Sequence, residues 1–434
     1  MEKWEKQMKM KANPQLPESV EQRISDTLGS LPKRKSYFRL YSSAAAVLII
    51  GALMFGASYM SPTVAETMRS VPVIGSIFKM VGDVGTQKGE KEGLTTLLGQ
   101  QAEINGQVIT FTESLYDGSK IHIGYLIESY TQEKDMLSTD FLSDIRFTID
   151  GKGVSYGMGA NGKELENGDY AGIISIRIHD SLPDQFTLGI GSQKDSALNL
   201  ELEITKQGEN RSFLVNQTVE TDDLTMHVDK VTFYPTSTEI AFRQVMDVHT
   251  FENKKYEWLD YQVVDDQGRV LQPLSGGGLG GPEKDGKLVQ SMTYYFEPFE
   301  EIPRSLTIKP YLVVGNENVE YVKAKWAGEN VTLSQGEIGE ITVLDMKSED
   351  GIVTLLVKTN GADAFWQANS ILLEDKNGEE IHQEQTPKRV DDAVNQYEIQ
   401  FDADVTENDI QIVTYKQNAP NFLDELEVTV KVRE

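Results

Sequence analysis

The sequence predicts a mainly β protein: a single amino-terminal transmembrane helix followed by tandem antiparallel β-sandwich domains of the immunoglobulin-like kind. Three observations lead to this fold class. Residues 40–65 are twenty-six consecutive positions without a charged side chain. From about residue 101 onward, apolar residues recur at every second position, which is the period of strands with one buried face. One arrangement of strand patterns and Asp-x-x-Gly turns also occurs three times along the chain.

Residues 1–37 are predicted to be a cytoplasmic segment with a short amphipathic helix. After Pro17, four apolar residues recur at spacings of four, four and three, which places them on one helical face. A helix this short needs a partner surface to bury that face. The candidate partner-binding residues are these four and two apolar residues nearer the amino terminus: Val20, Ile24, Leu28, Leu31, Trp4 and Met8. A frayed tether with incidental periodicity is the alternative.

Residues 38–61 are predicted to be a transmembrane helix. The apolar run is long enough to cross a bilayer, and a helix satisfies its own backbone hydrogen bonds in lipid. Four basic residues within 33–39 precede the run, and Glu66 is the first charge after it. Because positive flanks stay in the cytoplasm, we expect a single-pass protein of the cell membrane with extracytoplasmic carboxyl-terminal domains. A cleaved signal peptide, with Thr63-Val64-Ala65 at its cleavage site, and a buried helix of a soluble protein are the alternatives.

Residues 62–100 are predicted to be a juxtamembrane helical segment. Prolines and glycines interrupt any long helix there, while the stretch 71–81 is strongly apolar. Two short helices, lying against either the outer leaflet or the first sandwich, would bury this stretch.

The threefold repeat predicts three sandwiches, at residues 101–209, 210–329 and 330–434. In each repeat a paired-strand pattern precedes a strand that ends in a turn led by Asp150, Asp265 or Asp375. Asp and Gly favour such turns, because Asp bonds nearby backbone and Gly tolerates positive φ. A unit of roughly 110 residues with about seven short strands has the size of an antiparallel sandwich. The polar Gly-Glu-Asn turns at 208–210 and 328–330 set the boundaries, so the alternating pattern 426–432 closes the third sandwich.

No stretch carries a catalytic, cofactor-binding or metal-binding pattern. The chain has no cysteine, and its five histidines share no metal-ligand spacing. We expect His122, His179 and His227 to be solvent-facing strand residues. The glycine-rich run 275–282 lacks the ending of a phosphate loop and is predicted to be a flexible loop. Acidic pairs such as Asp265-Asp266 are predicted to be solvated turns, with calcium at domain junctions as the less favoured alternative. We therefore expect no enzyme activity, catalytic residue, cofactor or metal.

The net charge of −27 is unevenly placed. Residues 1–40 hold nine Lys or Arg and five Asp or Glu, so the acidic excess lies entirely in the rest of the chain. An acidic surface disfavours nucleic acid, whose binding depends on neutralising phosphates. We therefore expect no nucleic acid partner, and we read the charge as a source of solubility.

The chain resembles a family of single-pass envelope proteins of Gram-positive bacteria whose domain is catalogued as being of unknown function. The resemblance rests on Leu16-Pro17-Glu18-Ser19-Val20, on Ser61-Pro62-Thr63-Val64-Ala65-Glu66 after the anchor, and on the Pro-Val-Ile-Gly-x-Ile-Phe block at 72–78. Members are often described as negative effectors, or anti-sigma factors, of extracytoplasmic-function (ECF) sigma factors. Unlike the zinc-type anti-sigma domains, which use a His-and-Cys motif, this chain has no cysteine.

The resemblance implies a membrane-anchored extracytoplasmic regulator whose amino-terminal segment binds a cytoplasmic sigma factor. The alternative is a structural or adhesive surface stalk that binds an envelope protein or a wall ligand and takes no part in signalling. A wall-acting enzyme is a third interpretation, but no constellation of residues supports it.

Overall fold

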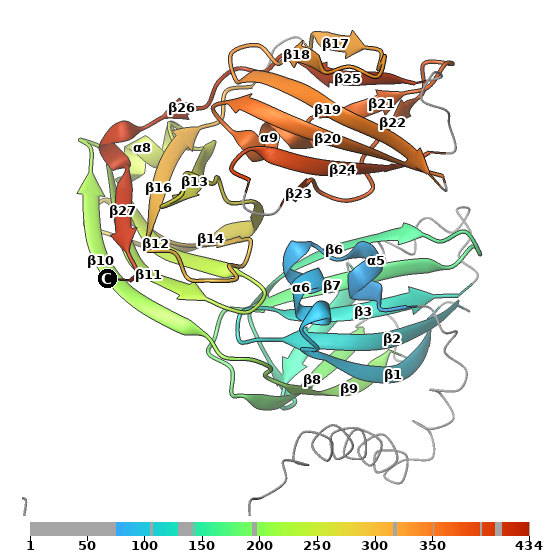
Figure 1. The fold of residues 1–434 in the computed structure, drawn as a ribbon. Helices are drawn as coiled ribbons and strands as arrows, with labels where there is room; N and C mark the ends of the chain where they lie inside the picture. The colour runs from blue at the N-terminus through green and yellow to red at the C-terminus, as the bar shows by residue number, and fades with distance from the viewer. Residues whose placement is uncertain are drawn as a thin grey trace, which may run out of the picture. The chain divides into compact units, whose positions relative to one another are not determined.

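The structure, a computed structural model, describes residues 75–433 except 105–106, 129–141, 143, 193–197, 316–318, 350, 391–392 and 404–409. In this part the prediction of a mainly β protein is confirmed, because six antiparallel sheets make up most of it (Figure 1). No helix among the described residues is long and apolar enough to span a membrane. The expected transmembrane segment 38–61 lies outside them, as do the candidate partner-binding residues Trp4, Met8, Val20, Ile24, Leu28 and Leu31.

The first sandwich packs two sheets around one apolar core. The five-stranded sheet has the order β1-β2-β3-β7-β6, and the facing sheet has the order β5-β4-β8-β9. Inward-pointing residues of both sheets, such as Phe111, Ile123 and Leu188, are buried in this core. The strands are β1 (Thr95–Ile104), β2 (Gln107–Tyr116), β3 (Ile121–Ile127), β4 (Ile145–Ile149), β5 (Lys152–Gly153), β6 (Tyr156–Glu164), β7 (Tyr170–Ile178), β8 (Gln185–Ser192) and β9 (Asn199–Thr205).

The second sandwich pairs the sheet β10-β11-β12-β15-β14 with a sheet in which β16 lies between β13 and the strands β26 and β27. Val228, Phe242 and Ile308 lie in the core between the two sheets. The elements are β10 (Arg211–Glu220), β11 (Leu224–Phe233), β12 (Thr238–Asp247), α8 (Val248–Glu252), β13 (Leu259–Asp265), β14 (Pro273–Lys284), β15 (Lys287–Phe296), β16 (Ser305–Leu312), β26 (Asn421–Phe422), the short 3-10 helix η3 (Asp424–Leu426) and β27 (Val428–Lys431).

The third sandwich pairs the sheet β18-β19-β20-β24-β23 with the sheet β17-β25-β21-β22. Val343, Leu355 and Phe401 lie in its core. The elements are β17 (Tyr321–Ala324), β18 (Val331–Ser334), β19 (Gly339–Glu349), β20 (Ile352–Gly361), α9 (Ala364–Asn369), β21 (Leu372–Glu374), β22 (Glu380–Ile381), β23 (Lys388–Arg389), β24 (Gln396–Asp402) and β25 (Gln411–Tyr415).

The five-stranded sheets share one topology. In each, three consecutive strands are followed across the sheet by the last strand and then by the strand before it, as in β1-β2-β3-β7-β6. The aspartate-led turns recur at equivalent places, at the ends of β4, β13 and β21. Asp265 and Asp375 each accept two backbone N–H groups from the residues that follow, and Gly268 and Gly378 have positive φ. The repeat inferred from sequence is therefore a repeat of topology.

The second and third sandwiches exchange their closing strands. In the first sandwich, β9 follows β8 in sequence and pairs with it. By contrast, β17 follows β16 but pairs with β25 of the third sandwich, and β26 and β27 come after β25 but pair with β16 of the second. The predicted ranges 210–329 and 330–434 are therefore wrong for these strands. The cause is that alternation predicts a strand, but it does not say which of two similar sheets the strand will join.

Two short helices cover the outer face of the first five-stranded sheet. They are α5 (Ile77–Val81) and α6 (Val84–Lys91), and α5 contacts β3, β6 and β7 (Figure 1). Because β1 begins at Thr95, the helical segment ends earlier than the predicted residue 100, and residues 62–74 of the predicted range lie outside the described part of the chain. The cover also buries His122 on β3, which is only 2% exposed, so the prediction of a solvent-facing residue was wrong there. His179 and His227 are partly exposed.

The glycine-rich run 275–282 is part of an edge strand, β14, and the prediction of a flexible loop was wrong. The strand forms an antiparallel ladder with β15. A Cβ at Gly276 would lie 2.5 Å from the ring of Tyr294, and one at Gly278 would lie 2.2 Å from Met292 Sδ. Large side chains of β15 thus occupy the space that β14 leaves empty at these two positions.

Candidate functional site

The helix pair α5 and α6, which we call the α5–α6 joint, contacts parts of the chain that lie far apart in sequence. Helix α5 is fixed to the first sandwich by burial of Ile77, Phe78 and Val81. Its amino-terminal end is held by Glu113 on β2, whose Oε1 accepts hydrogen bonds from Phe78 N at 3.1 Å and Ser76 Oγ at 2.8 Å. Burial raises the pKa of Glu113, although these two hydrogen bonds act in the opposite direction.

Helix α6 lies against the turn between β11 and β12 of the second sandwich. A Cβ at Gly85 would lie 2.0 Å from the carbonyl oxygen of Thr236, so this close approach requires glycine. Asp117 of the first sandwich holds the same turn, because Asp117 Oδ2 accepts hydrogen bonds from Thr236 N at 3.0 Å and Thr236 Oγ1 at 2.6 Å. Lys88 on α6 also donates to the carbonyl oxygen of Phe299 at 2.8 Å.

The third sandwich reaches the α5–α6 joint through one glutamine between β22 and β23. Gln385 Nε2 donates to the carbonyl oxygen of Met80 at 3.0 Å, and its Oε1 accepts from Gln87 Nε2 at 2.9 Å. One side chain of the third sandwich therefore binds both helices. The joint contacts all three sandwiches, and in sequence it lies between the first of them and the segment 38–61 that the sequence analysis assigned to the membrane.

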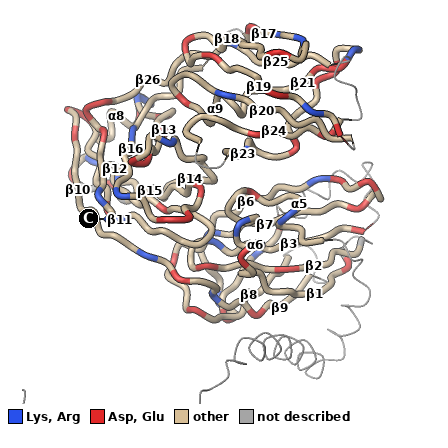
Figure 2. The backbone as a smooth tube through the Cα atoms, in the orientation of Figure 1, with Lys and Arg blue, Asp and Glu red and all other residues tan. Residues whose placement is uncertain are grey.

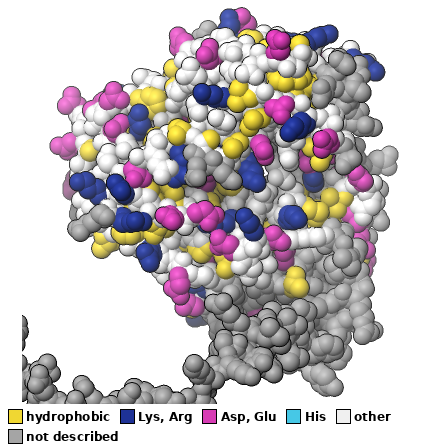
Figure 3. All heavy atoms as spheres, in the orientation of Figure 1, with side chains coloured by type: hydrophobic (Ala, Val, Ile, Leu, Met, Phe, Trp, Pro, Cys, Tyr) yellow, Lys and Arg dark blue, Asp and Glu magenta, His cyan; other side chains and the backbone are white. Residues whose placement is uncertain are grey.

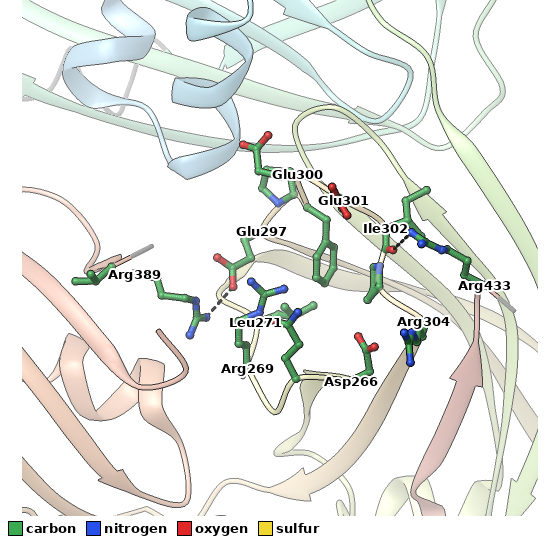
Figure 4. Close-up of a pocket in the computed structure, with 15 residues that line it drawn as sticks. Asp266, Arg269, Leu271, Glu297, Glu300, Glu301, Ile302, Arg304, Arg389 and Arg433 are labelled. Carbon is green, nitrogen blue, oxygen red and sulfur yellow. Dashed lines mark hydrogen bonds and ion pairs between the residues drawn. The ribbon is translucent and has the colours of Figure 1, made fainter. Parts of the chain in front are cut away.

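A pocket lined by four arginines lies beside the joint, where the second and third sandwiches meet (Figure 4). Its volume is about 770 Å³. The arginines come from the β13–β14 loop, the β15–β16 loop, β23 and the carboxyl end of the chain: Arg269, Arg304, Arg389 and Arg433.

Arg389 joins the two sandwiches across this pocket. Its Nη2 donates to Glu297 Oε1 at 2.8 Å and to the carbonyl oxygen of Val270, and its Nη1 donates to the hydroxyl of Tyr397 at 3.0 Å. The side chains of Arg389 and Glu297 are 12% and 19% exposed, so most of this pair is out of water. Burial alone would lower the pKa of Arg389, but Glu297 and Tyr397 raise it above its ordinary value.

The pocket's charges are nearly balanced, which limits what it can bind. Arg269 is paired with Asp265, and Arg389 with Glu297. Arg304 and Arg433 are exposed, but the exposed carboxylates of Glu300, Glu301 and Asp266 line the same pocket. Such a set suits a polar ligand bearing both charges better than a polyanion. Figure 2 likewise shows acidic and basic residues intermixed along the backbone, and Figure 3 shows their side chains intermixed on one face of the molecule.

The joint and the pocket were missed by reasoning from sequence. Gln385, Glu297 and Arg389 belong to no motif, and they meet only because distant loops fold together. The glycines of α6 were a usable signal, since glycine inside a helix is unfavourable without a packing reason. Among the described residues, no group of three or more His, Asp or Glu side chains could hold a metal ion.

Two family models match parts of the chain. The model described as a domain of unknown function (DUF4179) matches residues 33–129, and the model described as a family of unknown function (DUF5643) matches residues 210–333. The first match runs through both helices of the joint and the strands β1–β3 that carry it. The matches agree with the resemblance to a family that contains a domain of unknown function. No curated protein matches the chain.

Two solved structures show weak likeness. One is the conserved domain protein from Bacillus anthracis, which is 20% identical with a TM-score of 0.41 over 58% of this chain and 90% of that chain. The other is bovine butyrophilin, which is 8% identical with a TM-score of 0.12 over 44% of this chain and 84% of that chain. Both TM-scores are too low to indicate a shared fold.

Proposed function

We propose that the protein is a single-pass, membrane-anchored extracytoplasmic sensor that acts as a negative effector of an ECF-type sigma factor. In this proposal, residues 38–61 span the membrane, residues 1–37 bind the sigma factor in the cytoplasm, and three immunoglobulin-like sandwiches lie outside the cell. The match to the domain of unknown function over residues 33–129 supports it, as does the basic flank of the apolar run. The role is one of binding and requires no catalysis.

The observation that carries the proposal is the set of contacts at the α5–α6 joint. A sensor needs a physical connection between its ligand-binding domains and the segment that enters the membrane. Phe299, Thr236 and Gln385 supply contacts from the second and third sandwiches to the helices that follow the proposed span. A change in either sandwich can therefore act on these helices directly.

The alternative is a structural or adhesive surface stalk that binds an envelope protein or a wall ligand. Three sandwiches in one chain are consistent with a spacer, and the acidic composition suits a surface protein. A spacer, however, gives no reason for the third sandwich to contact the helices next to the anchor, as Gln385 does. For this reason we prefer the regulator.

The first test is a crosslinked pull-down from native membranes, with full-length protein and a variant lacking residues 2–36 as baits. The proposal expects a sigma factor that is captured only by the full-length bait. Recovery of the same envelope proteins by both baits, with no cytoplasmic partner, would instead establish the stalk.

A second test asks whether the joint transmits a signal. Gly85→Ala places a Cβ against the Thr236 carbonyl and should displace α6, whereas Gly75→Ala meets no atom within 4 Å and serves as the matched control. We expect Gly85→Ala, but not Gly75→Ala, to change transcription from promoters of the captured sigma factor at equal protein abundance. Identical transcription in the two variants would show that the joint does not transmit the signal.

A further inference from the structure

Three glycines that line one cleft, on two edge strands, are not required by close packing or by a positive φ. They are Gly157 and Gly159 on β6 and Gly277 on β14. A Cβ at any of them would meet no atom within 4 Å, and their φ angles lie outside the left-handed region. Glycine inside a strand weakens it and commonly marks a place where a ligand or another backbone approaches closely.

Both strands are free edges that line one cleft. Among the strands that the structure describes, β6 pairs only with β7 and β14 pairs only with β15, so each leaves a row of backbone N–H and C=O groups without a described neighbouring strand (Figure 1). Residues of both strands line the same cleft of about 560 Å³, beside the amino-terminal end of α6. The cleft therefore offers two templates for an added strand.

The open glycines uncover polar side chains on the next strand. In the ladder registers, Gly157 lies opposite Arg177, and Gly159 lies opposite Ser175. Gly277 lies opposite Thr293. Directly opposed residues point to the same face of a sheet, so a side chain at these glycine positions would cover its polar neighbour. With glycine there, Arg177, Ser175 and Thr293 all line the cleft.

The cleft is basic although the chain as a whole is strongly acidic. Arg177 and Lys120 both line it, and within the described residues neither has a carboxylate at ion-pair distance. Lys120 is only 6% exposed and burial lowers its pKa, so Arg177 is the cation that a ligand in the cleft can pair with. Lys120 Nζ donates to Ser275 Oγ at 3.2 Å and lies 5.0 Å from the ring centroid of Tyr295. The acidic residue of the lining, Asp83, accepts hydrogen bonds from Thr86 N and Thr86 Oγ1 and so caps α6.

We propose that this cleft binds an extended acidic peptide, which adds as a strand to the edge of β6. The free N–H and C=O groups of β6 supply main-chain hydrogen bonds to the peptide. An acidic side chain opposite Gly157 crosses β6, where no side chain blocks it, and forms an ion pair with Arg177. Adjacent strands lie about 4.8 Å apart, so a glutamate and an arginine on either side of one strand can meet.

This proposal does not depend on the regulation of a sigma factor. A surface stalk could bind a peptide in the same way. The proposal commits to a peptide because the cleft presents two strand edges, each with alternating donors and acceptors. A small anion would use Arg177 and Lys120 but would leave those edges without a function.

The test is fluorescence anisotropy with the full-length protein in detergent micelles. The probe is a fluorescein-labelled peptide, Val-Thr-Val-Glu-Val-Thr-Val. Two companion peptides replace its Glu by Lys or carry N-methyl groups on alternate amides, which removes backbone donors. We expect saturable binding of the probe and at least tenfold weaker binding of each companion.

Protein variants separate the cleft from other surfaces. Gly157→Val fills the path across β6 and Arg177→Gln removes the charge, and each should weaken the probe at least tenfold. Gly153→Val on β5 also meets open space, so this matched control should bind like the wild type. Unchanged binding to Gly157→Val or Arg177→Gln, or equal binding of the N-methylated peptide, would overturn the proposal. Displacement of the probe by millimolar inorganic phosphate would overturn it in favour of a small-anion site.

Discussion

The exchange of closing strands makes a quantitative prediction about Val430. This side chain is 2% exposed and lies in the core of the second sandwich, although it follows the third sandwich in sequence. Val430→Ala removes two buried methyl groups and leaves a cavity, so we expect a loss of about 2 kcal/mol in the free energy of unfolding. Thr429→Ala changes the outward-facing neighbour on β27 and should cost much less.

Hydrogen exchange followed by mass spectrometry would locate the loss. With Val430→Ala, the largest gain in exchange should occur in β16 and β13, because β27 pairs with β16. If β27 instead closed the third sandwich, as β9 closes the first, the gain would fall in β25 and β21. That second pattern would refute the exchange. The family model that matches residues 210–333 includes β17 in the same unit as the second sandwich, whereas in this structure β17 joins the third sandwich. The test therefore decides between two assignments of the closing strands.

Three further predictions concern single side chains. Burial lowers the pKa of His122 to about 4, so the folded state favours the neutral imidazole. The stability that this provides is complete above pH 6.5, and the free energy of unfolding should fall by about 2 kcal/mol by pH 5. Urea unfolding of His122→Gln should therefore depend less on pH than unfolding of the wild type. Glu113→Ala leaves the N–H of Phe78 without its acceptor, so the free energy of unfolding should fall by about 1–3 kcal/mol and hydrogen exchange in α5 should become faster. Glu103→Ala changes an exposed glutamate and should have neither effect. Arg389→Met leaves the carboxylate of Glu297 without its ion-pair partner and should lower the free energy of unfolding by about 2 kcal/mol, measured by thermal or urea unfolding. The double variant with Glu297→Gln should recover most of that loss.

The sequence was informative where a structure depends on neighbouring residues. The paired-strand pattern at the start of each repeat predicted a hairpin, and the structure has one there in each sandwich: β2–β3, β11–β12 and β19–β20. These strands alternate because one face of each lies in a core. Local propensity and burial agreed, so the prediction was reliable.

Features that depend on distant parts of the chain could not be predicted. Strand β14 has too many glycines to show alternation, and only its ladder with β15 makes it a strand. His122 alternates like an exposed residue, but helices from an earlier segment cover its face of the sheet. Gln385 binds helices some three hundred residues before it in sequence. In each case the deciding neighbour is far away along the chain.

The exchange and the joint together indicate which parts can move as units. Helix α5 is held to the first sandwich by buried apolar side chains, whereas α6 meets Phe299 and Gln385 through single hydrogen bonds, each worth about 1 kcal/mol. Separating the second sandwich from the third would require β17 and β27 to leave their sheets. The second and third sandwiches should therefore move together, and the contacts to α6 should break first. In the proposed regulator, a ligand of either sandwich would thus act on the membrane-proximal helices through Gln385 and Lys88, and Gln385→Ala should weaken its effect on transcription without lowering the stability of the third sandwich.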